Sequence, residues 1–357
     1  MKSTKPNEQQ LPLYLPRLQD ASSNNIVVLA GDIGGTKTHL GLYRSDKSKM
    51  ELLHETIYHS QKFPTFTAIV HQFLLEIKKD IPDRISIGVA GPVINGKVQT
   101  TNLPWQIDGA ALMKETGVKE VSLLNDLEAN AYGIAGLTST DITTIYEQRS
   151  VAPGNVAIIA PGTGLGEAGL FWDGQFYHPF ATEGGHCDFA PQTDMDIALY
   201  HFLKQKHEVV SWEHLVSGPA IYEIYRFLRD VIKREEPHWL EVRLNADDPS
   251  AVISHTALQG LSDLCDETMV LFTRYLAREC CNLVLKMKAT GGLYIGGGIP
   301  PKIAKYIEAS YFYETFSKSD RMDELVKAVP VHLILNSRTA LIGAAYYGAF
   351  GAIQTFS

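Results

Sequence analysis

The sequence predicts an α/β protein of two domains, each with a mixed β-sheet flanked by helices. The first observation is the length of 357 residues, since one domain usually takes about 150 residues. The second is a strand, a glycine turn and a returning strand over residues 26–43, and the third is a similar pattern from residue 155. A hairpin therefore opens each half, and we expect two related halves around a cleft.

The first half is expected to begin near residue 26, after an N-terminal arm. Residues 1–25 combine Pro, Asn, Gln and Ser with a short Leu-Pro run, which is typical of a flexible segment, although such a run can dock on a surface. An apolar run over 26–30 and alternating residues over 38–43 predict two strands around the first glycine turn. The other predicted elements are strands at 54–58, 85–90 and 121–124 and helices at 66–79 and 110–115.

The second half repeats the hairpin pattern and then becomes helical. Residues 156–160 are apolar, and 168–172 return as a strand after a glycine-rich turn. The remaining predicted elements are helices at 194–206, 220–233 and 261–289 and strands at 293–295 and 331–335. The uncharged segment 339–357 has an apolar stretch shorter than the ~20 residues that cross a bilayer, so its small residues predict a buried helix.

Composition narrows the classes of partner. The chain carries 32 Lys and Arg against 40 Asp and Glu, a net charge of −8, and no cationic run. This balance argues against nucleic-acid binding and against an anionic membrane surface, since both need clustered cations. Its four cysteines are too few and too irregularly spaced for a disulfide framework or a zinc knuckle. Because no signal peptide is recognisable, we expect a cytoplasmic protein with reduced thiols.

Two glycine-rich turns are candidate phosphate sites. In Gly31–Thr36 and in Gly162–Gly166, backbone NH groups can converge on an anion because few side chains stand in the way. Asp32 can hold a hydrated Mg²⁺ beside the first turn. A tight hairpin turn is the alternative, but the presence of two such turns favours paired phosphate cradles. Neither fits a Walker A loop or the dinucleotide fingerprint, because no Gly-Lys-Ser/Thr occurs and a strand follows each turn.

Asp126 is the candidate catalytic base. It follows the apolar strand 121–124, at a position where an open sheet presents side chains to a crevice. A carboxylate there can accept the proton of a substrate hydroxyl as that hydroxyl attacks phosphorus. The alternative is structural, since Asn125 and Glu128 have the spacing of a helix capping box. The two roles are compatible, because Asn125 can cap the helix while Asp126 faces the cleft.

Polar residues of the second half are candidates for sugar binding. Glu183 and His186 flank two glycines in a loop, and their side chains can form hydrogen bonds with vicinal hydroxyls. The alternative for this loop is a metal site formed by His186, Cys187 and Asp188. Glu213 lies near a predicted helix start, where it can cap the helix or bind a ligand. Gly296–Gly298 can admit a flat base against bare backbone, or simply lead into a helix that begins at the following prolines.

Six motifs together resemble the bacterial glucokinase family. They lie at residues 31–36, 124–127, 160–166, 183–191, 216–219 and 296–299, and they cover nearly the whole chain after the arm. The resemblance implies an α/β, ribonuclease H-like fold of the actin and hexokinase type, in which ATP and glucose meet in a central cleft between two domains. The zinc-binding cysteine motif of the related repressor, open-reading-frame and kinase group is absent.

The resemblance also implies roles for individual residues. It implies that Asp126 is the catalytic base. The assignment of Asp32 to Mg²⁺ through water comes from its place in the glycine turn and not from the resemblance. The implied sugar ligands are Asn102, Asn125, Asp126, Glu183, His186 and Glu213. The resemblance implies that the first glycine turn is the ATP phosphate loop, and the glycine runs of the second half are added to it as candidates. The expected ATP-binding residues are Gly31, Asp32, Ile33, Gly34, Gly35, Thr36, Gly162, Thr163, Gly164, Gly296, Gly297 and Gly298. Lys37 departs from the Asn of other members, which leaves contacts just beyond the phosphate loop open.

The expected domains are a small one at 26–136 plus 337–357, because the last helix of the family returns to it, and a large one at 137–336. The expected reaction is phosphorylation of D-glucose by ATP with Mg²⁺ to give glucose 6-phosphate, the first step of glycolysis. The family suggests a homodimer. The alternatives are a kinase for another hexose, such as mannose or N-acetylglucosamine, and a non-catalytic sugar sensor.

Overall fold

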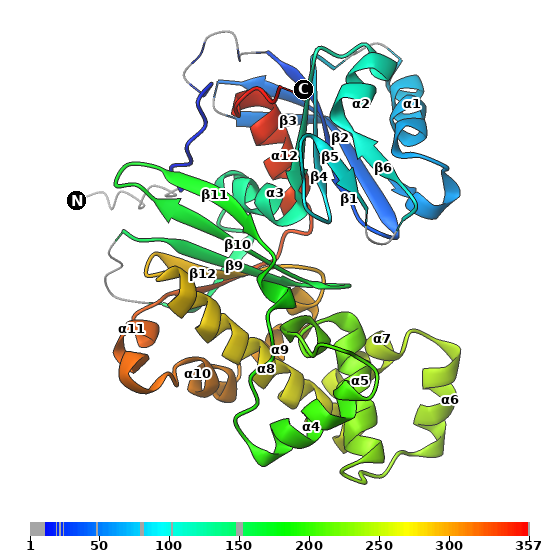
Figure 1. The fold of residues 1–357 in the computed structure, drawn as a ribbon, viewed down its shortest axis with the longest axis vertical. Helices are drawn as coiled ribbons and strands as arrows, with labels where there is room; N and C mark the ends of the chain where they lie inside the picture. The colour runs from blue at the N-terminus through cyan, green and yellow to red at the C-terminus, as the bar shows by residue number, and fades with distance from the viewer. Residues whose placement is uncertain are drawn as a thin grey trace, which may run out of the picture. The chain divides into compact units, whose positions relative to one another are not determined.

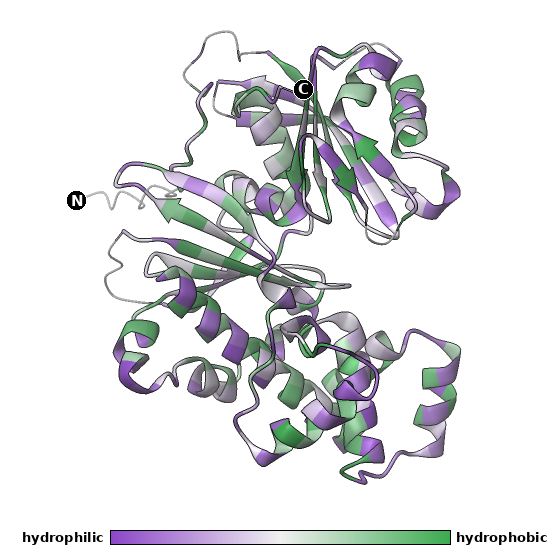
Figure 2. Ribbon diagram, viewed as in Figure 1, coloured by the Kyte–Doolittle hydropathy of each residue, from purple (hydrophilic) through white to green (hydrophobic). Residues whose placement is uncertain are grey.

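The computed structural model describes residues 11–18, 20, 23, 25–47, 49–78, 82–100, 103–147 and 153–355. The chain forms two compact units. Unit 1 comprises Met1–Asp141, Leu170–Ala181 and Asn336–Ser357, and unit 2 comprises Ile142–Gly169 and Thr182–Leu335. The expected boundaries differ from this grouping chiefly at Leu170–Ala181, which was expected to lie with 137–336. Most helices carry both hydrophobic and hydrophilic residues, as amphipathic packing requires (Figure 2).

Unit 1 is built on a five-stranded sheet with the order β3-β2-β1-β4-β7. Its strands are β1 (Val27–Ile33), β2 (Lys37–Asp46), β3 (Lys49–His59), β4 (Arg84–Val89) and β7 (Glu120–Asn125). The first three strands pair antiparallel, whereas β4 and β7 run parallel to β1. The carboxyl ends of β1, β4 and β7 therefore lie at one edge of the sheet. A short hairpin, β5 (Lys97–Gln99) and β6 (Gln106–Asp108), follows β4.

Helices cover both faces of this sheet (Figure 1). The four helices are α1 (Phe66–Ile77), α2 (Gly109–Thr116), α3 (Asp126–Gly133) and α12 (Thr339–Phe350). Alternate residues of β1 point to opposite faces. Leu29 packs in the cluster that contains residues of α1 and α2, whereas Ala30 packs against Leu341 of α12. The mixed sheet with flanking helices confirms the expectation for the first half.

The uncharged C-terminal segment forms the buried helix that the sequence predicts. Eleven of the twelve residues of α12 are buried. Its close approach to α3 depends on glycine, because a Cβ at Gly343 would collide with the carbonyl oxygen of Ala129. A Cβ at Gly133 of α3 would likewise collide with the carbonyl oxygen of Thr339. Among the described residues, no helix is both long enough and apolar enough to cross a membrane.

The expectation of a flexible arm is wrong for residues 11–18. Leu13 and Leu15 are buried, and Leu13 pairs with Tyr177 in a parallel β-bridge. The Arg17 guanidinium donates from Nε to the carbonyl oxygen of Gly351 at 2.6 Å and from Nη1 to Oε2 of Glu120 at 2.7 Å. The alternating leucines of the Leu-Pro run supply enough apolar surface to dock this segment on unit 1, the second possibility that the sequence left open.

We expect Arg17→Ala to lower the free energy of unfolding by about 1 kcal/mol, because it removes two charge-assisted hydrogen bonds. The loss stays modest, since Glu120 keeps its ion pair with Arg84 at 3.1 Å. Urea unfolding of both proteins measures the difference. Arg17→Lys keeps the charge but loses the forked geometry, so its stability should fall between the two. An Arg17→Ala protein as stable as the wild type would contradict the docking of this segment.

The second sheet has six strands in the order β11-β10-β9-β12-β13-β8. Its strands are β8 (Ile142–Tyr146), β9 (Val156–Pro161), β10 (Leu165–Trp172), β11 (Tyr177–Thr182), β12 (Gly292–Ile295) and β13 (Val331–Ile334). β12 runs parallel to β9 and β13 parallel to β12, whereas β8 is antiparallel to β13. From β11 to β13, the strands follow one another along the chain in the same way as those of the unit 1 sheet from β3 to β7. A duplicated hairpin pattern predicts this repetition.

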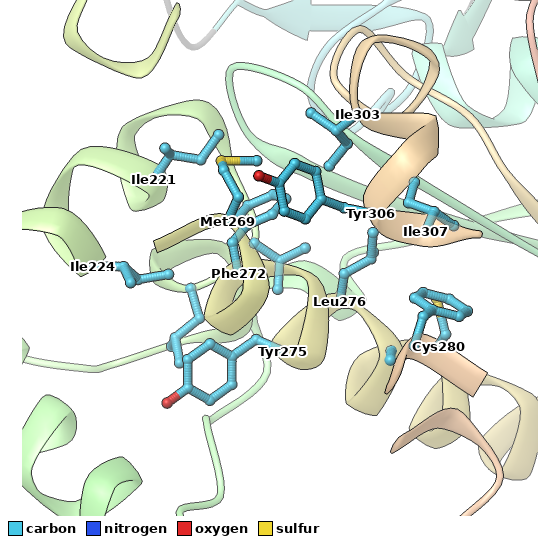
Figure 3. Packing of buried hydrophobic residues seen from close by; sticks show 14 of the residues in the cluster. Ile221, Ile224, Met269, Phe272, Tyr275, Leu276, Cys280, Ile303, Tyr306 and Ile307 are labelled. Carbon is cyan, nitrogen blue, oxygen red and sulfur yellow. The ribbon is translucent and has the colours of Figure 1, made fainter. Parts of the chain in front are cut away.

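The helices of unit 2 pack around one long central helix. They are α4 (Asp194–Lys204), α5 (Gly218–Asp230), α6 (His238–Ala246), α7 (Pro249–Leu258), α8 (Asp263–Met287), α9 (Ala304–Ile307), α10 (Ser310–Phe316) and α11 (Asp323–Lys327). Figure 3 shows Met269, Phe272 and Leu276 of α8 in the middle of the apolar core, with residues of α5 and α9 around them. Helix α8 has 25 residues, which confirms the long helix predicted at 261–289.

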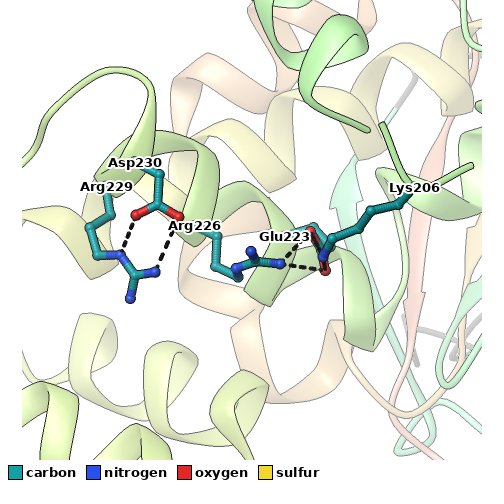
Figure 4. A network of polar contacts seen from close by, with 5 residues as sticks. All are labelled: Lys206, Glu223, Arg226, Arg229 and Asp230. Carbon is teal, nitrogen blue, oxygen red and sulfur yellow. Dashed lines mark hydrogen bonds and ion pairs between the residues drawn. The ribbon is translucent and has the colours of Figure 1, made fainter. Parts of the chain in front are cut away.

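The solvent side of α5 carries ion pairs rather than apolar contacts. Glu223 pairs with Lys206 at 2.8 Å and with Arg226 at 3.3 Å, and Arg229 pairs with Asp230 at 2.7 Å (Figure 4). Partly exposed pairs of this kind contribute little stability individually. They mark the outer face of α5, so its opposite, apolar face is the one that packs on α8.

Candidate active site

The first glycine turn extends from the carboxyl end of β1. The Gly34 amide donates to the carbonyl oxygen of Lys37 at 2.9 Å, which closes the turn between β1 and β2. Ser60 donates from its amide to the carbonyl oxygen of Thr36 and from its hydroxyl to that of Gly34. Both carbonyl groups are thereby directed toward Ser60. A turn with its carbonyls engaged in this way suits the binding of an anion by backbone NH groups.

Asp32 and Asp126 are close neighbours at the same edge of the unit 1 sheet. Asp32 pairs in register with Gly88 of β4, and Asp126 begins α3 directly after β7. A Cβ at Gly88 would lie 2.9 Å from Cβ of Ala129 and 3.8 Å from Cα of Asp126, so this glycine lets α3 lie close over the strand. Burial, followed by the charge of Asp126, raises the pKa of Asp32 to about 7.

Asn125 caps helix α3. Its side-chain oxygen accepts from the amides of Leu127 at 2.8 Å and Glu128 at 3.3 Å, and its Nδ2 donates to the carbonyl oxygen of Gly91. The N-cap role predicted for Asn125 is therefore confirmed. The cap fixes the start of α3 and with it the position of the Asp126 backbone.

The glycine runs of unit 2 meet at the carboxyl ends of β9 and β12. The Gly218 amide, at the N-terminus of α5, donates to the carbonyl oxygen of Gly162 at 2.7 Å. Gly297 packs against Pro161, where a Cβ would lie 2.5 Å from the carbonyl oxygen, and its φ of 87° favours glycine. The segments 162–164 and 296–298 are thus brought together beside a helix N-terminus, which is a favourable environment for phosphate.

The three polar candidates of unit 2 are held by two adjoining 3₁₀ turns, η4 (Gly184–His186) and η5 (Trp212–His214). A β-bridge between Asp188 and Ser211 joins the segments that carry them. Glu183 precedes η4, and its side chain is exposed, as is that of His186. Glu213 lies in η5 and accepts from the Leu165 amide at 2.8 Å. The structure therefore brings Glu183, His186 and Glu213 to the start of β10.

His214 also belongs to this cluster, although it was not among the residues predicted for the site. Its ring stacks on that of His207, with 3.9 Å between ring centroids, and its Nδ1 accepts from the Ser211 amide. Burial lowers the pKa of His214, and the nearby His207 and His186 lower it further against the opposing effect of Glu213. A neutral His214 beside Glu213 follows. Its position three residues after Ser211, as in a capping box, is the one signal that the sequence offered.

Asn102, an implied sugar ligand, lies outside the described residues. Lys37 begins β2 and pairs in register with His59, next to the first glycine turn. Within the part of the chain that the structure describes, no group of three or more His, Cys, Asp or Glu side chains is placed to hold a metal ion. Nothing there supports the alternative metal site at His186.

Comparisons with known proteins agree on one family. The family profile named "Glucokinase" matches residues 29–349. A glucokinase from Trichormus variabilis is 40% identical over 340 residues, which cover 90% of this chain and 99% of that protein. A glucokinase from Nostoc sp. is 41% identical over 340 residues, with the same two coverages.

Solved structures agree on the fold. The crystal structure of a glucokinase from an Antarctic psychrotroph has a TM-score of 0.77 and 31% identity, covering 90% of this chain and 98% of that one. These similarities confirm the actin and hexokinase type of α/β fold that the motifs implied.

Proposed function

Since this chain belongs to the glucokinase family, we propose that it transfers the γ-phosphoryl group of ATP to the 6-hydroxyl of D-glucose. The observation that carries this proposal is the position of Asp126, which begins α3 beside Asp32 at the edge of the sheet where the Gly31–Thr36 turn lies. A base and a phosphate loop at one sheet edge are what phosphoryl transfer to a hydroxyl requires.

In the proposed reaction, Asp126 accepts the proton of the 6-hydroxyl as its oxygen attacks the γ-phosphorus. The new bond joins that oxygen to phosphorus, the bond between the γ-phosphorus and the bridging oxygen breaks, and ADP leaves. Asn125 positions the base through the cap of α3. Glu183, His186 and Glu213 bind the sugar hydroxyls, and Asn102 is a further proposed sugar contact.

Backbone groups hold the nucleotide in this proposal. The proposed ATP-binding segments are 31–36, 162–164 and 296–298, whose glycines place no side chain between the backbone and a phosphate or a flat base. An acidic chain can bind a polyanion in this way, because the local positive potential comes from amides and a helix N-terminus rather than from lysines.

Asp32 fits a divalent cation. It is a carboxyl group of unit 1 that is desolvated and repelled by Asp126, and a nearby Mg²⁺ would offset that repulsion. Such an ion would neutralise charge on the phosphates of ATP. Asp32 would hold it through water, in keeping with the tendency of Mg²⁺ to retain its hydration shell.

A coupled assay of ADP release over a panel of sugars tests the function. We expect ADP release to saturate as the concentration of D-glucose rises. ADP release should be much slower with mannose and with N-acetylglucosamine. Omission of sugar measures ATP hydrolysis, which should be slow. A preference for another hexose would make the chain a kinase for that sugar, and the absence of release with every sugar would favour a non-catalytic sensor.

We propose that the enzyme works in the cytoplasm, because its four free thiols suit a reducing compartment. The reaction itself favours a place at the first step of glycolysis. The family suggests a homodimer, which light scattering during size-exclusion chromatography tests. A mass of one chain, near 39.5 kDa, would contradict it.

A further inference from the structure

A buried carboxyl group, that of Glu167, lies under the turn that carries Glu183 and His186, and a second one, that of Glu279, lies near it. Glu167 of β10 is 1% exposed and Glu279 of α8 is 0% exposed, and the two carboxyl groups are close enough for the charge of Glu279 to act on Glu167. Two ionised carboxylates are acceptors only, so neither can offset the charge of the other. Like charges held close in a dry site favour the state in which the pair keeps one proton.

The other contacts show which group carries the proton. Glu279 accepts from Nδ2 of Asn282 at 2.8 Å and from Nζ of Lys286 at 3.4 Å, so its charge is compensated. Oε1 of Glu167 is buried, and no hydrogen-bond partner for it occurs among the described residues. The proton accordingly lies on Glu167, the group without a donor.

Burial and the charge of Glu279 raise the pKa of Glu167 to about 8, and Lys286 lowers it. Cys280 of α8 also faces the pair, and burial raises the pKa of its thiol far enough to keep it neutral. The folded state therefore holds a proton that an ordinary glutamate releases near pH 4.5. The stability from this proton is complete at low pH and is lost as the pH rises through about 8.

Glu167 is in direct contact with the sugar-binding turn. A Cβ at Gly184 would collide with Oε2 of Glu167, so the turn rests on this carboxyl group. Thr182 adds a second link, because its hydroxyl donates to the carbonyl oxygen of Glu167 at 3.0 Å and accepts from the Gly184 amide at 3.2 Å. Two residues earlier in β10, the Leu165 amide donates to Glu213. One short strand segment thus supports both 3₁₀ turns.

We propose that Glu167 and Glu279 are positioning residues of the sugar site: while they share a proton they hold the Glu183–His186 turn in its glucose-binding form, and loss of that proton weakens glucose binding. The proposal rests on the proposed function. When the pair is fully ionised, two like charges repel beneath Gly184, and the turn is the element free to move outward. The effect falls on KM for glucose and on its binding constant, and kcat stays nearly constant, since Asp126 belongs to unit 1.

The test compares the pH profile of the wild type with that of Glu167→Gln. The amide of glutamine can donate to Glu279 in place of the shared proton, and it does not titrate in this range. Between pH 7 and pH 9 we expect KM for glucose to rise roughly threefold to tenfold in the wild type and to stay level in Glu167→Gln. Glu241→Gln, which changes an exposed carboxylate on α6, serves as the control and should follow the wild type. Calorimetry with glucose in the absence of ATP should give the same pattern in the dissociation constant.

The outcomes separate this proposal from the function on which it rests. Parallel KM profiles for the wild type and Glu167→Gln, with normal turnover at pH 7, would overturn the positioning role and leave the function intact. No phosphorylation of glucose at pH 7 would overturn both. Urea unfolding at the two pH values supplies a further check, because the wild type should lose stability at pH 9 relative to Glu167→Gln. An equal change in both proteins would overturn the shared proton.

Discussion

Asp126→Asn is expected to lower kcat by a factor of about 10² to 10⁴, while KM for glucose changes by no more than several-fold. Asparagine has nearly the same shape, and its side-chain oxygen can still accept from the Leu127 amide as Asp126 does at 3.0 Å. It cannot take up the proton of the sugar hydroxyl. The base step is therefore lost and binding is retained, which steady-state kinetics at saturating ATP would show.

A matched control is Asp108→Asn. Asp108 caps α2 of the same unit, and its Oδ1 accepts from the amides of Ala110 and Ala111. Asparagine caps a helix about as well as aspartate, so this variant should keep both stability and turnover. Near-normal turnover in Asp126→Asn would remove Asp126 from the role of base.

The second large effect is expected for stability. Gly343→Ala should lower the free energy of unfolding by about 3 kcal/mol, because the added Cβ collides with the carbonyl oxygen of Ala129 and forces α12 away from α3. The loss should occur although alanine favours helix by up to about 1 kcal/mol over glycine. Urea denaturation followed by circular dichroism measures it.

Gly348→Ala in the same helix is the comparison. There the added Cβ would meet side-chain atoms, Cγ1 of Val28 at 2.6 Å and Cβ of Ser86 at 2.8 Å, and not a backbone oxygen. Both contacts are longer than the one between a Cβ at Gly343 and the carbonyl oxygen of Ala129, and that carbonyl is fixed by the hydrogen bonds of α3, so the loss should be smaller. Equal losses in the two variants would show that contact with the α3 backbone is not what limits α12.

Local pattern was sufficient for many elements of the fold. Periodicity predicted the long helix that became α8, and composition predicted α12 as a buried helix. Helices α6 and α7 were not predicted, because their apolar residues do not form one clear helical face. In α6, Leu240 and Leu244 are buried, whereas Trp239 and Val242 are exposed. The arm was misjudged at Leu13 and Leu15 because their burial depends on partners such as Tyr177, far away in the sequence.

The candidate site likewise contains residues that local patterns indicate and residues whose role depends on tertiary contacts. Glycine turns and the residues after strands are local signals, so Asp32, Asp126 and Glu183 could be singled out as candidates. Gly88 carries no motif, and its small size matters only because α3 lies over it. For Glu213 the residues alone left capping and ligand binding open, and only the resemblance implied a sugar ligand. Its bond to the Leu165 amide joins positions 48 residues apart, so no local pattern indicates it.

The sequence by itself determined the family, the pair of glycine-led hairpins and the carboxylates available for chemistry, since these depend on residue type and on spacing along the chain. Only the tertiary structure decided which groups share an environment. It placed the charge of Asp126 beside Asp32, rested Gly184 on Glu167 and set Glu167 against Glu279 of α8. The physical reason is that burial and the charge of a neighbour set the protonation of a carboxyl group, and both are fixed by contacts between distant segments.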